Sequence, residues 1–252
     1  MKMFDKRISP VYKNKMDFVD ENLSASDGIV LDVGCGAGHY FHIYKKKNLI
    51  FKGIDVDKKI LPINEDVFCA DVQYLPFNSS TFDTLIGMDV LEHVKNDKKA
   101  IAEIYRVLKK NGKLILSVPN KNYPFVYDPI NKFLNLFNYH LPIGLWAWGH
   151  RRLYTEKQIK KLLVNQGFKI VRYKKHSYFL VALSVNYTAY LASYVLLPLL
   201  KTIGFKKKAR FKTKSNLENS PVYNLYSFIN KLDKKYFSKY SPIHHCFIVK
   251  KS

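Results

Sequence analysis

Two histidines, His93 and His150, carry side chains suited to proton transfer. An imidazole ordinarily titrates near neutral pH, so either residue could act as the general base for an oxygen nucleophile. His93 follows Asp89 and Glu92 at a spacing that would place all three side chains on one face of a helical turn. Such a trio could bind a divalent metal, but one short segment does not define a metal site, and none is predicted. A structural role stays open for each histidine.

A glycine-rich stretch near the N-terminus predicts a ligand-binding turn. Gly34, Gly36 and Gly38 alternate directly after the apolar run 29–33, which is typical of a strand buried on both faces. Glycine lets a chain turn sharply and lets a ligand lie against bare backbone. The GxGxG spacing differs from the GxGxxG of dinucleotide binders, and Asp32 would repel a pyrophosphate but attract a cation. A tight turn without a ligand is the alternative.

Further polar side chains follow the next predicted strands. The strand at 49–54 ends in Asp55, about twenty residues after Asp32, where a carboxylate can accept both hydroxyls of a ribose. A solvated strand-end aspartate is the alternative for Asp55. A third strand at 67–70 precedes Asp71, and a fourth at 82–88 precedes Asp89. These carboxylates are therefore expected at one edge of a sheet.

Two stretches resemble a known family. Residues 31–38 (LDVGCGAG) and 75–94 (LPFNSSTFDTLIGMDVLEHV) are similar to motifs of the class I S-adenosylmethionine-dependent methyltransferases, in particular the type 11, UbiG-like group. The resemblance covers residues 28–118 with specific motifs, and 149–173 and 243–250 more loosely. It implies S-adenosyl-L-methionine as the cofactor. A nicotinamide-dependent Rossmann domain is the alternative.

The resemblance also implies which residues hold the cofactor. The glycine loop would hold the methionine end, with its ammonium group near Asp32, and Asp55 would bind the ribose. Asp71 would accept from the adenine amino group, while the backbone of its neighbour reads the ring. The full set of predicted cofactor-binding residues is Asp32, Gly34, Gly36, Gly38, Asp55, Asp71, Val72, Met88 and Asp89.

Strands and helices alternate along the chain, which predicts an α/β fold. Amphipathic helices are expected at 97–110, with Gly112 as the cap, and from the Thr155-x-x-Gln158 capping box to Gly167. Further strands are expected at 113–118, 168–173 and 246–250. With the resemblance, the prediction is a doubly wound, seven-stranded Rossmann-like methyltransferase sheet with helices on both faces and two insertions.

The predicted domains are an N-terminal lid helix in residues 1–27 and a methyltransferase domain in 28–252. The helix at 11–23 is amphipathic, and plain packing is the alternative to a lid. The insertions are 120–154 and 174–242, where substrate choice is expected because the cofactor half is generic. The first is rich in aromatic residues and ends in Gly149-His150-Arg-Arg-Leu-Tyr. A similar stretch in relatives places the histidine near the substrate.

The second insertion contains a charge-free core at 177–200 with lysines at both ends. Its length approaches that of a membrane span. One crossing, however, would put the strands at 168–173 and 246–250 on opposite sides of the membrane. No second span compensates, since the next apolar stretch, 222–229, is short and runs into lysines. Residues 178–205 are therefore predicted to lie on an anionic membrane surface, as a helix or as a shallow re-entrant hairpin. A helix buried in the domain or in a dimer interface is the alternative.

The composition of the chain bears on its possible binding partners and on the cell compartment in which it functions. The net charge of +22 over 252 residues fits either a polyanionic partner or a lysine-rich proteome. Three scattered cysteines indicate a reducing compartment, and the absence of an apolar leader at the start predicts a cytoplasmic protein, peripheral at the membrane if 178–205 binds lipid.

The predicted function is methyl transfer, at oxygen, to a small-molecule, lipid or lipid-linked glycan acceptor. The alternatives are an RNA methyltransferase and an S-adenosylmethionine-binding protein without turnover. RNA is less favoured as the acceptor than a lipid or glycan, because no (D/N)PPY motif follows the fourth strand and because basic residues cluster beside apolar segments.

Overall fold

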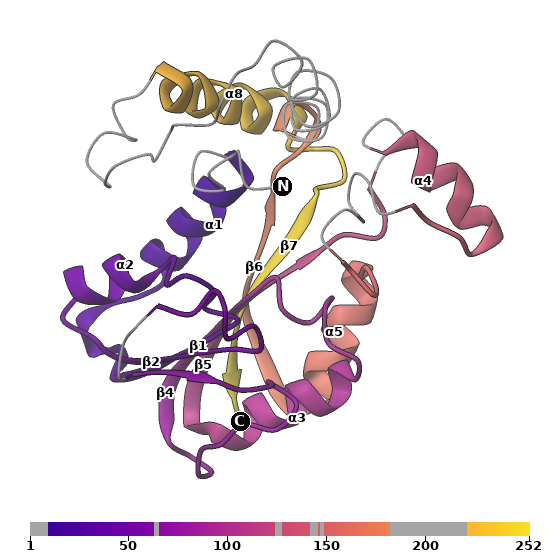
Figure 1. The fold of residues 1–252 in the computed structure, drawn as a ribbon. Coiled ribbons are helices and arrows are strands. Elements are labelled where there is room, and N and C mark those ends of the chain that lie inside the picture. Colours follow the sequence, from indigo (N-terminus) through magenta and orange to yellow (C-terminus); the bar gives the residue numbers. More distant parts are fainter. Residues whose placement is uncertain (1–9, 63–65, 124–127, 142–145, 147–148, 182–220) are drawn as a thin grey trace, which may run out of the picture. The chain divides into compact units, whose positions relative to one another are not determined.

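The computed structural model describes residues 10–62, 66–123, 128–141, 146, 149–181 and 221–252 (Figure 1). The chain divides into two compact units, each considered by itself. The sheet unit comprises residues 15–122, 149–175 and 244–252. The insertion unit comprises residues 1–14, 123–148 and 176–243.

Seven strands form one sheet in the order β3-β2-β1-β4-β5-β7-β6. Neighbours among β1 to β5 run parallel, and β7 runs antiparallel to β5. This arrangement confirms the predicted doubly wound, seven-stranded fold. The strands are β1 (Ile29–Val33), β2 (Ile50–Asp55), β3 (Val67–Cys69), β4 (Phe82–Met88), β5 (Leu108–Pro119), β6 (Phe168–His176) and β7 (His244–Lys251).

Helices cover both faces of the sheet, because its central strands are apolar on both sides. One core cluster joins Leu31 and Leu85 to residues of α3 (Asp97–Val107) and α5 (Glu156–Asn165). The other joins Val30 and Ile86 to residues of α1 (Pro10–Glu21) and α2 (Phe41–Lys46). Adjacent residues of one strand therefore point into opposite layers, as the alternation along a strand requires.

The boundary between α3 and β5 differs from the prediction. The helix ends at Val107 rather than at 110, because Leu108 is extended and pairs with Phe82 of β4. Gly112 consequently lies inside β5 and does not cap the helix. A Cβ at Gly112 would lie 2.7 Å from the carbonyl oxygen of Lys109, so glycine serves close backbone packing there. The capping box of Thr155 and Gln158 at the start of α5 is confirmed.

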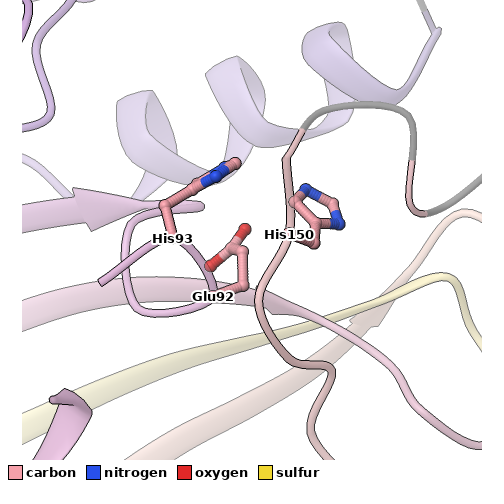
Figure 2. Close-up of side chains that lie close together, drawn as sticks. All are labelled: Glu92, His93 and His150. Carbon is pink, nitrogen blue, oxygen red and sulfur yellow. The ribbon is translucent and has the colours of Figure 1, made fainter. Parts of the chain in front are cut away.

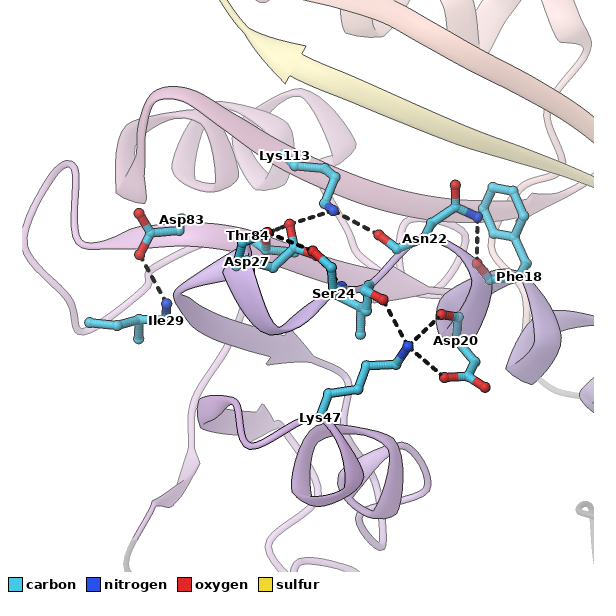
Figure 3. Close-up of polar contacts among 12 residues, drawn as sticks. Phe18, Asp20, Asn22, Ser24, Asp27, Ile29, Lys47, Asp83, Thr84 and Lys113 are labelled. Atoms are coloured by element: carbon cyan, nitrogen blue, oxygen red, sulfur yellow. Dashed lines mark hydrogen bonds and ion pairs between the residues drawn. The ribbon is translucent and has the colours of Figure 1, made fainter.

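Within the sheet unit, two lysines hold the end of α1 and the residues that lead to β1, as Figure 3 shows. Lys113 of β5 pairs with Asp27 at 2.5 Å and donates to the carbonyl oxygen of Asn22 at 2.7 Å. Asp27 belongs to a short 3-10 helix, η2 (Ala25–Asp27). Lys47 donates to the carbonyl oxygens of Asp20 and Leu23 at 3.0 and 2.8 Å.

Replacing Lys113 with methionine is expected to destabilise the protein by about 1–3 kcal/mol, because it leaves a largely buried carboxylate and carbonyl without their donor. The measurement is urea unfolding followed by circular dichroism. Lys109→Met is the matched control, since Lys109 pairs with Asp83 at a more exposed position and should lose less than about 1 kcal/mol. Equal losses in the two variants would contradict this account of the anchor.

The described part of the insertion unit is largely helical and includes three named elements that begin and end within it. They are α4 (Pro129–Leu134), the 3-10 helix η4 (Asn135–Phe137) and α8 (Pro221–Phe237). The sequence interpretation missed α8, reading 222–229 only as a short apolar stretch that runs into lysines. Within the described residues, no helix is long and apolar enough to cross a membrane. Most of the predicted membrane-surface segment, 178–205, lies outside the described residues.

Candidate active site

The carboxyl ends of β1 to β5 meet at one edge of the sheet, because neighbouring strands in this group run parallel. In open α/β sheets, ligands bind at this edge where the strand order reverses. Here the order reverses between β1 and β4. The predicted site residues at the ends of β1, β2 and β4 therefore belong to one region of the sheet unit.

The glycine loop turns immediately after β1. The backbone N–H groups of Gly34 and Cys35 both donate to the carbonyl oxygen of Ile54, at 2.8 and 3.0 Å. Gly34, Gly36 and Gly38 all have positive φ angles, of 70, 54 and 76°. A Cβ at Gly34 would lie 2.7 Å from Val90 Cγ2, so the turn after β4 packs directly against this loop. Only glycine fits that conformation and contact.

Asp32 lies beneath the loop and is 1% exposed. Its carboxylate accepts a hydrogen bond from the Tyr44 hydroxyl of α2 at 3.0 Å. Burial raises the pKa of Asp32 to about 7, the Tyr44 hydrogen bond opposes this rise, and the nearby charge of Asp55 adds to it. The predicted contact with an ammonium group stays a prediction, and Tyr44 is a partner that the sequence interpretation missed.

Asp55 ends β2 and holds the glycine loop. One carboxylate oxygen accepts from the backbone N–H of Gly36 at 3.0 Å, and the other accepts from Asp57 at 2.9 Å. A carboxylate oxygen has a second lone pair, so both oxygens can still accept from ribose hydroxyls. The ribose-binding role of Asp55 stays a prediction, and its hydrogen bond to Gly36 joins the end of β2 to the glycine loop.

Asp71 and Val72 follow β3. Asp71 accepts from the backbone N–H of Gln73 at 2.8 Å and from its side-chain amide at 2.9 and 3.1 Å. Val72 is buried in the core cluster beside α3. Gln73 therefore fixes the carboxylate that was predicted to accept from adenine.

Asp89 lies just past β4 in a charged cluster that the sequence did not reveal. Its carboxylate forms an ion pair with Lys15 of α1 and accepts from the Ser117 hydroxyl at 2.6 Å. Lys15 is 7% exposed, and its Nζ also lies 3.2 Å from Nε2 of His244. Burial would raise the pKa of Asp89, but the charges of Lys15 and His244 hold it well below its usual range. Met88, the preceding predicted residue, is buried in the other core cluster.

Glu92 is fully buried, and neither carboxylate oxygen has a hydrogen-bond partner among the described residues. Burial, reinforced by the charge of Asp89, raises the pKa of Glu92 well above its usual range. These surroundings disfavour the charged carboxylate relative to the uncharged acid.

The two predicted imidazoles come together from distant parts of the chain. The ring centroids of His93 and His150 are 4.8 Å apart with an interplanar angle of 67°, an edge-to-face contact. His93 Nδ1 lies 3.3 Å from the carbonyl oxygen of Gly149, and the N–H of Arg151 donates to the carbonyl oxygen of Glu92 at 2.7 Å. Figure 2 shows both rings beside the Glu92 carboxylate.

Glu92, His93 and His150 also form a candidate set of metal ligands. One ligand atom from each lies within 4.8 Å of the others. Ligand atoms about 2.1 Å from a tetrahedral ion would be about 3.4 Å apart, so the side chains must draw closer before they bind one. A protonated Glu92 would also have to lose its proton first. The chemistry that the arrangement supports as it stands is proton transfer.

Lys15, Ser117 and His244 surround the site, and the sequence interpretation omitted all three. One signal was available for Lys15. It precedes Phe18 and Val19 by three and four residues, so it shares the buried face of α1. Ser117 lies in β5, which pairs with β4, and His244 lies in β7, which pairs with β5. Only the tertiary structure reveals that these strands bring both side chains to the site.

Comparisons with known proteins agree with this geometry. A family profile described as a methyltransferase domain matches residues 6–173. An uncharacterised protein from Methanocaldococcus jannaschii is 36% identical over 170 residues, which cover 67% of this chain and 62% of that protein. The ubiquinone biosynthesis O-methyltransferase of Coxiella burnetii is 27% identical over 126 residues, covering 46% of this chain and 53% of the enzyme. The chain thus spans less than two thirds of the length of these relatives.

A solved structure supports the same fold. Phosphoethanolamine N-methyltransferase 2 from Haemonchus contortus, in complex with phosphomonomethylethanolamine and S-adenosylhomocysteine, superposes with a TM-score of 0.57 at 16% identity. The match covers 95% of this chain and 52% of that chain. The glycine loop and Asp55 fit the same cofactor, since a bare backbone turn and an accepting carboxylate lie together. The chain belongs to the class I S-adenosylmethionine-dependent methyltransferases.

Proposed function

We propose that this methyltransferase acts at an oxygen atom of a lipid, lipid-linked or other small-molecule acceptor. The observation that carries the proposal is the contact between His93 and His150 in the region where β4 ends. Val90, three residues before His93, packs against Gly34 of the cofactor loop. An oxygen nucleophile requires a general base close to the cofactor loop, because it must lose a proton. An acceptor that is already nucleophilic does not need one.

The bound cofactor supplies an electrophilic methyl group on a sulfonium. The protein has to align the acceptor with that methyl group and remove the acceptor's proton. In this proposal one imidazole accepts the proton while the second ring and Gly149 hold it in place.

The named relative favours the same acceptor class. The Coxiella burnetii enzyme is an O-methyltransferase of ubiquinone biosynthesis, and a quinone precursor of this kind is lipophilic. Methylation of RNA is the second candidate, supported by the net charge of +22. The segment after β4 reads Asp-Val-Leu-Glu, without the (D/N)PPY motif suited to exocyclic amines.

The test is a labelled-methyl assay. Purified protein is incubated with methyl-labelled S-adenosylmethionine and cell extract that has been separated into lipid, water-soluble, protein and RNA fractions. We expect label in the lipid or water-soluble small-molecule fraction, released as methyl iodide by hot hydriodic acid, which cleaves O-methyl ethers. Label confined to RNA or protein, or bound to nitrogen, would refute the proposal.

Cofactor affinity is expected to fall as the pH decreases below about 7. The pKa of Asp32 is raised to about 7, and a cationic cofactor favours its ionised form, so binding releases a proton below that pH. The dissociation constant for S-adenosylmethionine should then rise by up to about tenfold per pH unit. Calorimetry between pH 5.5 and 8 measures this, with Asp32→Asn as the non-titrating control. Identical pH profiles for both proteins would contradict the role given to Asp32.

Removing divalent metals with EDTA is expected to leave turnover unchanged, because the histidine pair performs the proton transfer and its ligand atoms, within 4.8 Å of one another, are not yet at coordination distance. The measurement is the labelled-methyl assay before and after dialysis against the chelator. Activity that disappears and then returns with added Mn²⁺ or Zn²⁺ would instead assign Glu92, His93 and His150 to a metal.

A further inference from the structure

Helix α8 of the insertion unit presents apolar side chains to solvent. Leu225, Phe228 and Tyr236 are 56, 57 and 56% exposed, and Leu232 is partly exposed. Their spacing of three, four and four residues places the four side chains along one face of the helix. We call these residues the apolar row. A surface helix ordinarily turns such a row toward the core.

A second row, of lysines, runs beside the apolar row. Lys231 and Lys235 of α8 are spaced four residues apart, Lys239 follows two residues beyond the end of the helix at Phe237, and all three are exposed. Two of them lie over aromatic rings, since Lys235 Nζ is 5.1 Å from the ring centroid of Tyr236 and Lys239 Nζ is 5.5 Å from that of Tyr240. The Lys235 ammonium group therefore sits at the border of the apolar row, and the Lys239 ammonium group lies beside Tyr240, just past the end of the helix.

Polar contacts fix the orientation of the helix. Asp233 is 2% exposed and accepts from the backbone N–H groups of Tyr178 and Leu180 at 2.6 and 2.7 Å. Asn230 accepts from the side-chain amide of Asn14 at 3.1 Å. The polar residues of α8 thus anchor it within the insertion unit, and the apolar row is left facing outward.

The described surface of the insertion unit offers no exposed carboxylate. Its described residues contain two acidic side chains, Asp128 and Asp233, which are 5 and 2% exposed. Over its whole sequence the unit has 16 Lys and Arg against 4 Asp and Glu. The exposed charges around α8 are consequently positive, and their complement is a negatively charged surface.

From these observations we infer that α8 docks the protein on an anionic lipid bilayer, with the apolar row in the acyl boundary and the lysine row on the head groups. An apolar face bordered by lysines is the pattern of helices that lie in a membrane interface. A second copy of the chain would bring its own lysine row against this one. A nucleic acid would match the lysines but would leave the apolar row without a partner.

The apolar row and the lysine row share no residue with the charge-free stretch 178–205, so each can be substituted without changing the other. The surface formed by the two rows also differs from the exposed apolar residues of α4 and η4, among them Phe133 and Phe137, since Lys132 is the single lysine among the described residues of that segment, 128–141. The binding face assigned to lipid is therefore α8 alone.

The test is co-sedimentation of the full chain with vesicles of phosphatidylcholine, alone or mixed with phosphatidylglycerol. We expect binding to the mixed vesicles in about 0.05 M salt and weaker binding in about 0.5 M salt, where charges are screened. Two triple variants should each weaken binding by at least about tenfold. They are Leu225→Ser, Phe228→Ser, Tyr236→Ser for the apolar row, and Lys231→Glu, Lys235→Glu, Lys239→Glu for the lysine row.

Matched controls change the same chemistry on the sheet unit. They are Lys98→Glu, Lys157→Glu, Lys161→Glu for charge and Ile50→Ser, Val164→Ser, Val171→Ser for apolar exposure, all at exposed positions. Both should bind vesicles within about twofold of wild type. Binding of S-adenosylhomocysteine, whose site lies in the sheet unit, checks that every variant is folded.

Three results would overturn the inference. Wild-type protein could stay in the supernatant with both kinds of vesicle. The apolar-row variant could bind as well as wild type, which would reduce the contact to nonspecific charge attraction. Finally, the lysine-row variant could lose binding to poly(U) RNA while keeping its vesicle binding, which would assign the face to nucleic acid.

Discussion

Replacing His150 or His93 with glutamine is expected to lower methyl-transfer turnover by about 10²–10⁴-fold, the usual contribution of a positioned general base. Glutamine keeps a polar side chain but cannot accept the acceptor's proton at neutral pH. Because the imidazoles contact each other with centroids 4.8 Å apart, loss of either ring disturbs the other. The effects of the two single variants should therefore not add in the double variant.

The same variants should leave the dissociation constant for S-adenosylhomocysteine near that of wild type, since neither ring contacts the glycine loop in any described interaction. His42→Gln is a matched control, because His42 lies on α2 and contacts the carbonyl oxygen of His39. If both site variants keep full activity, neither histidine is the base. If both lose cofactor affinity and turnover together, their role is structural.

Asp55→Ala is expected to weaken binding of S-adenosylmethionine and S-adenosylhomocysteine by about 1–3 kcal/mol, or about 5- to 150-fold in dissociation constant. The variant removes the predicted acceptor for the ribose and the acceptor for the Gly36 N–H, so the loop loses its support as well. Isothermal titration calorimetry measures the change. Wild-type protein should show no binding of NAD in the same instrument.

Asp57→Ala is the matched control for this substitution. Its carboxylate accepts from the backbone N–H of Lys59 at 3.0 Å, two residues further along the chain, and makes no described contact with the loop. Affinity in this variant should stay within about threefold of wild type. An Asp55→Ala protein that binds the cofactor as tightly as wild type would remove Asp55 from the cofactor site.

The sheet and its cofactor loop could be predicted from the sequence because their signals are local. The strand at 29–33 is apolar throughout, and the alternate glycines that follow it have few other uses. The capping box of Thr155 and Gln158 likewise depends on residues three positions apart. These elements lie where the sequence pattern predicted them.

The contacts that complete the site depend on packing between distant segments. A lysine on a helix is ordinarily solvated, yet Lys15 is buried against Asp89, 74 residues away. Glu92 likewise becomes buried, without a hydrogen-bond partner among the described residues, only when the chain folds. The sequence showed His93 and His150 as separate candidates, and the structure shows that they touch.

Two errors in the elements have related causes. Leu108 continues the apolar period of α3 and is buried, but it pairs with β4. The helical pattern in the sequence therefore extends past the true end of the helix into β5. In the sequence, the apolar residues at 222–229 are only a short stretch that runs into lysines, and it is the buried Asp233 that shows which side of α8 is anchored. In both cases tertiary contacts decided between two local interpretations.

The most direct test of the proposed chemistry is a methyl-transfer time course on the lipid and small-molecule fractions of cell extract. It compares wild-type protein with the variant that carries both His93→Gln and His150→Gln, using labelled S-adenosylmethionine. The account predicts an O-methyl product that accumulates with wild type and forms at least about a hundred times more slowly with the double variant. Equal rates in the two proteins, or a product methylated at nitrogen, would contradict it.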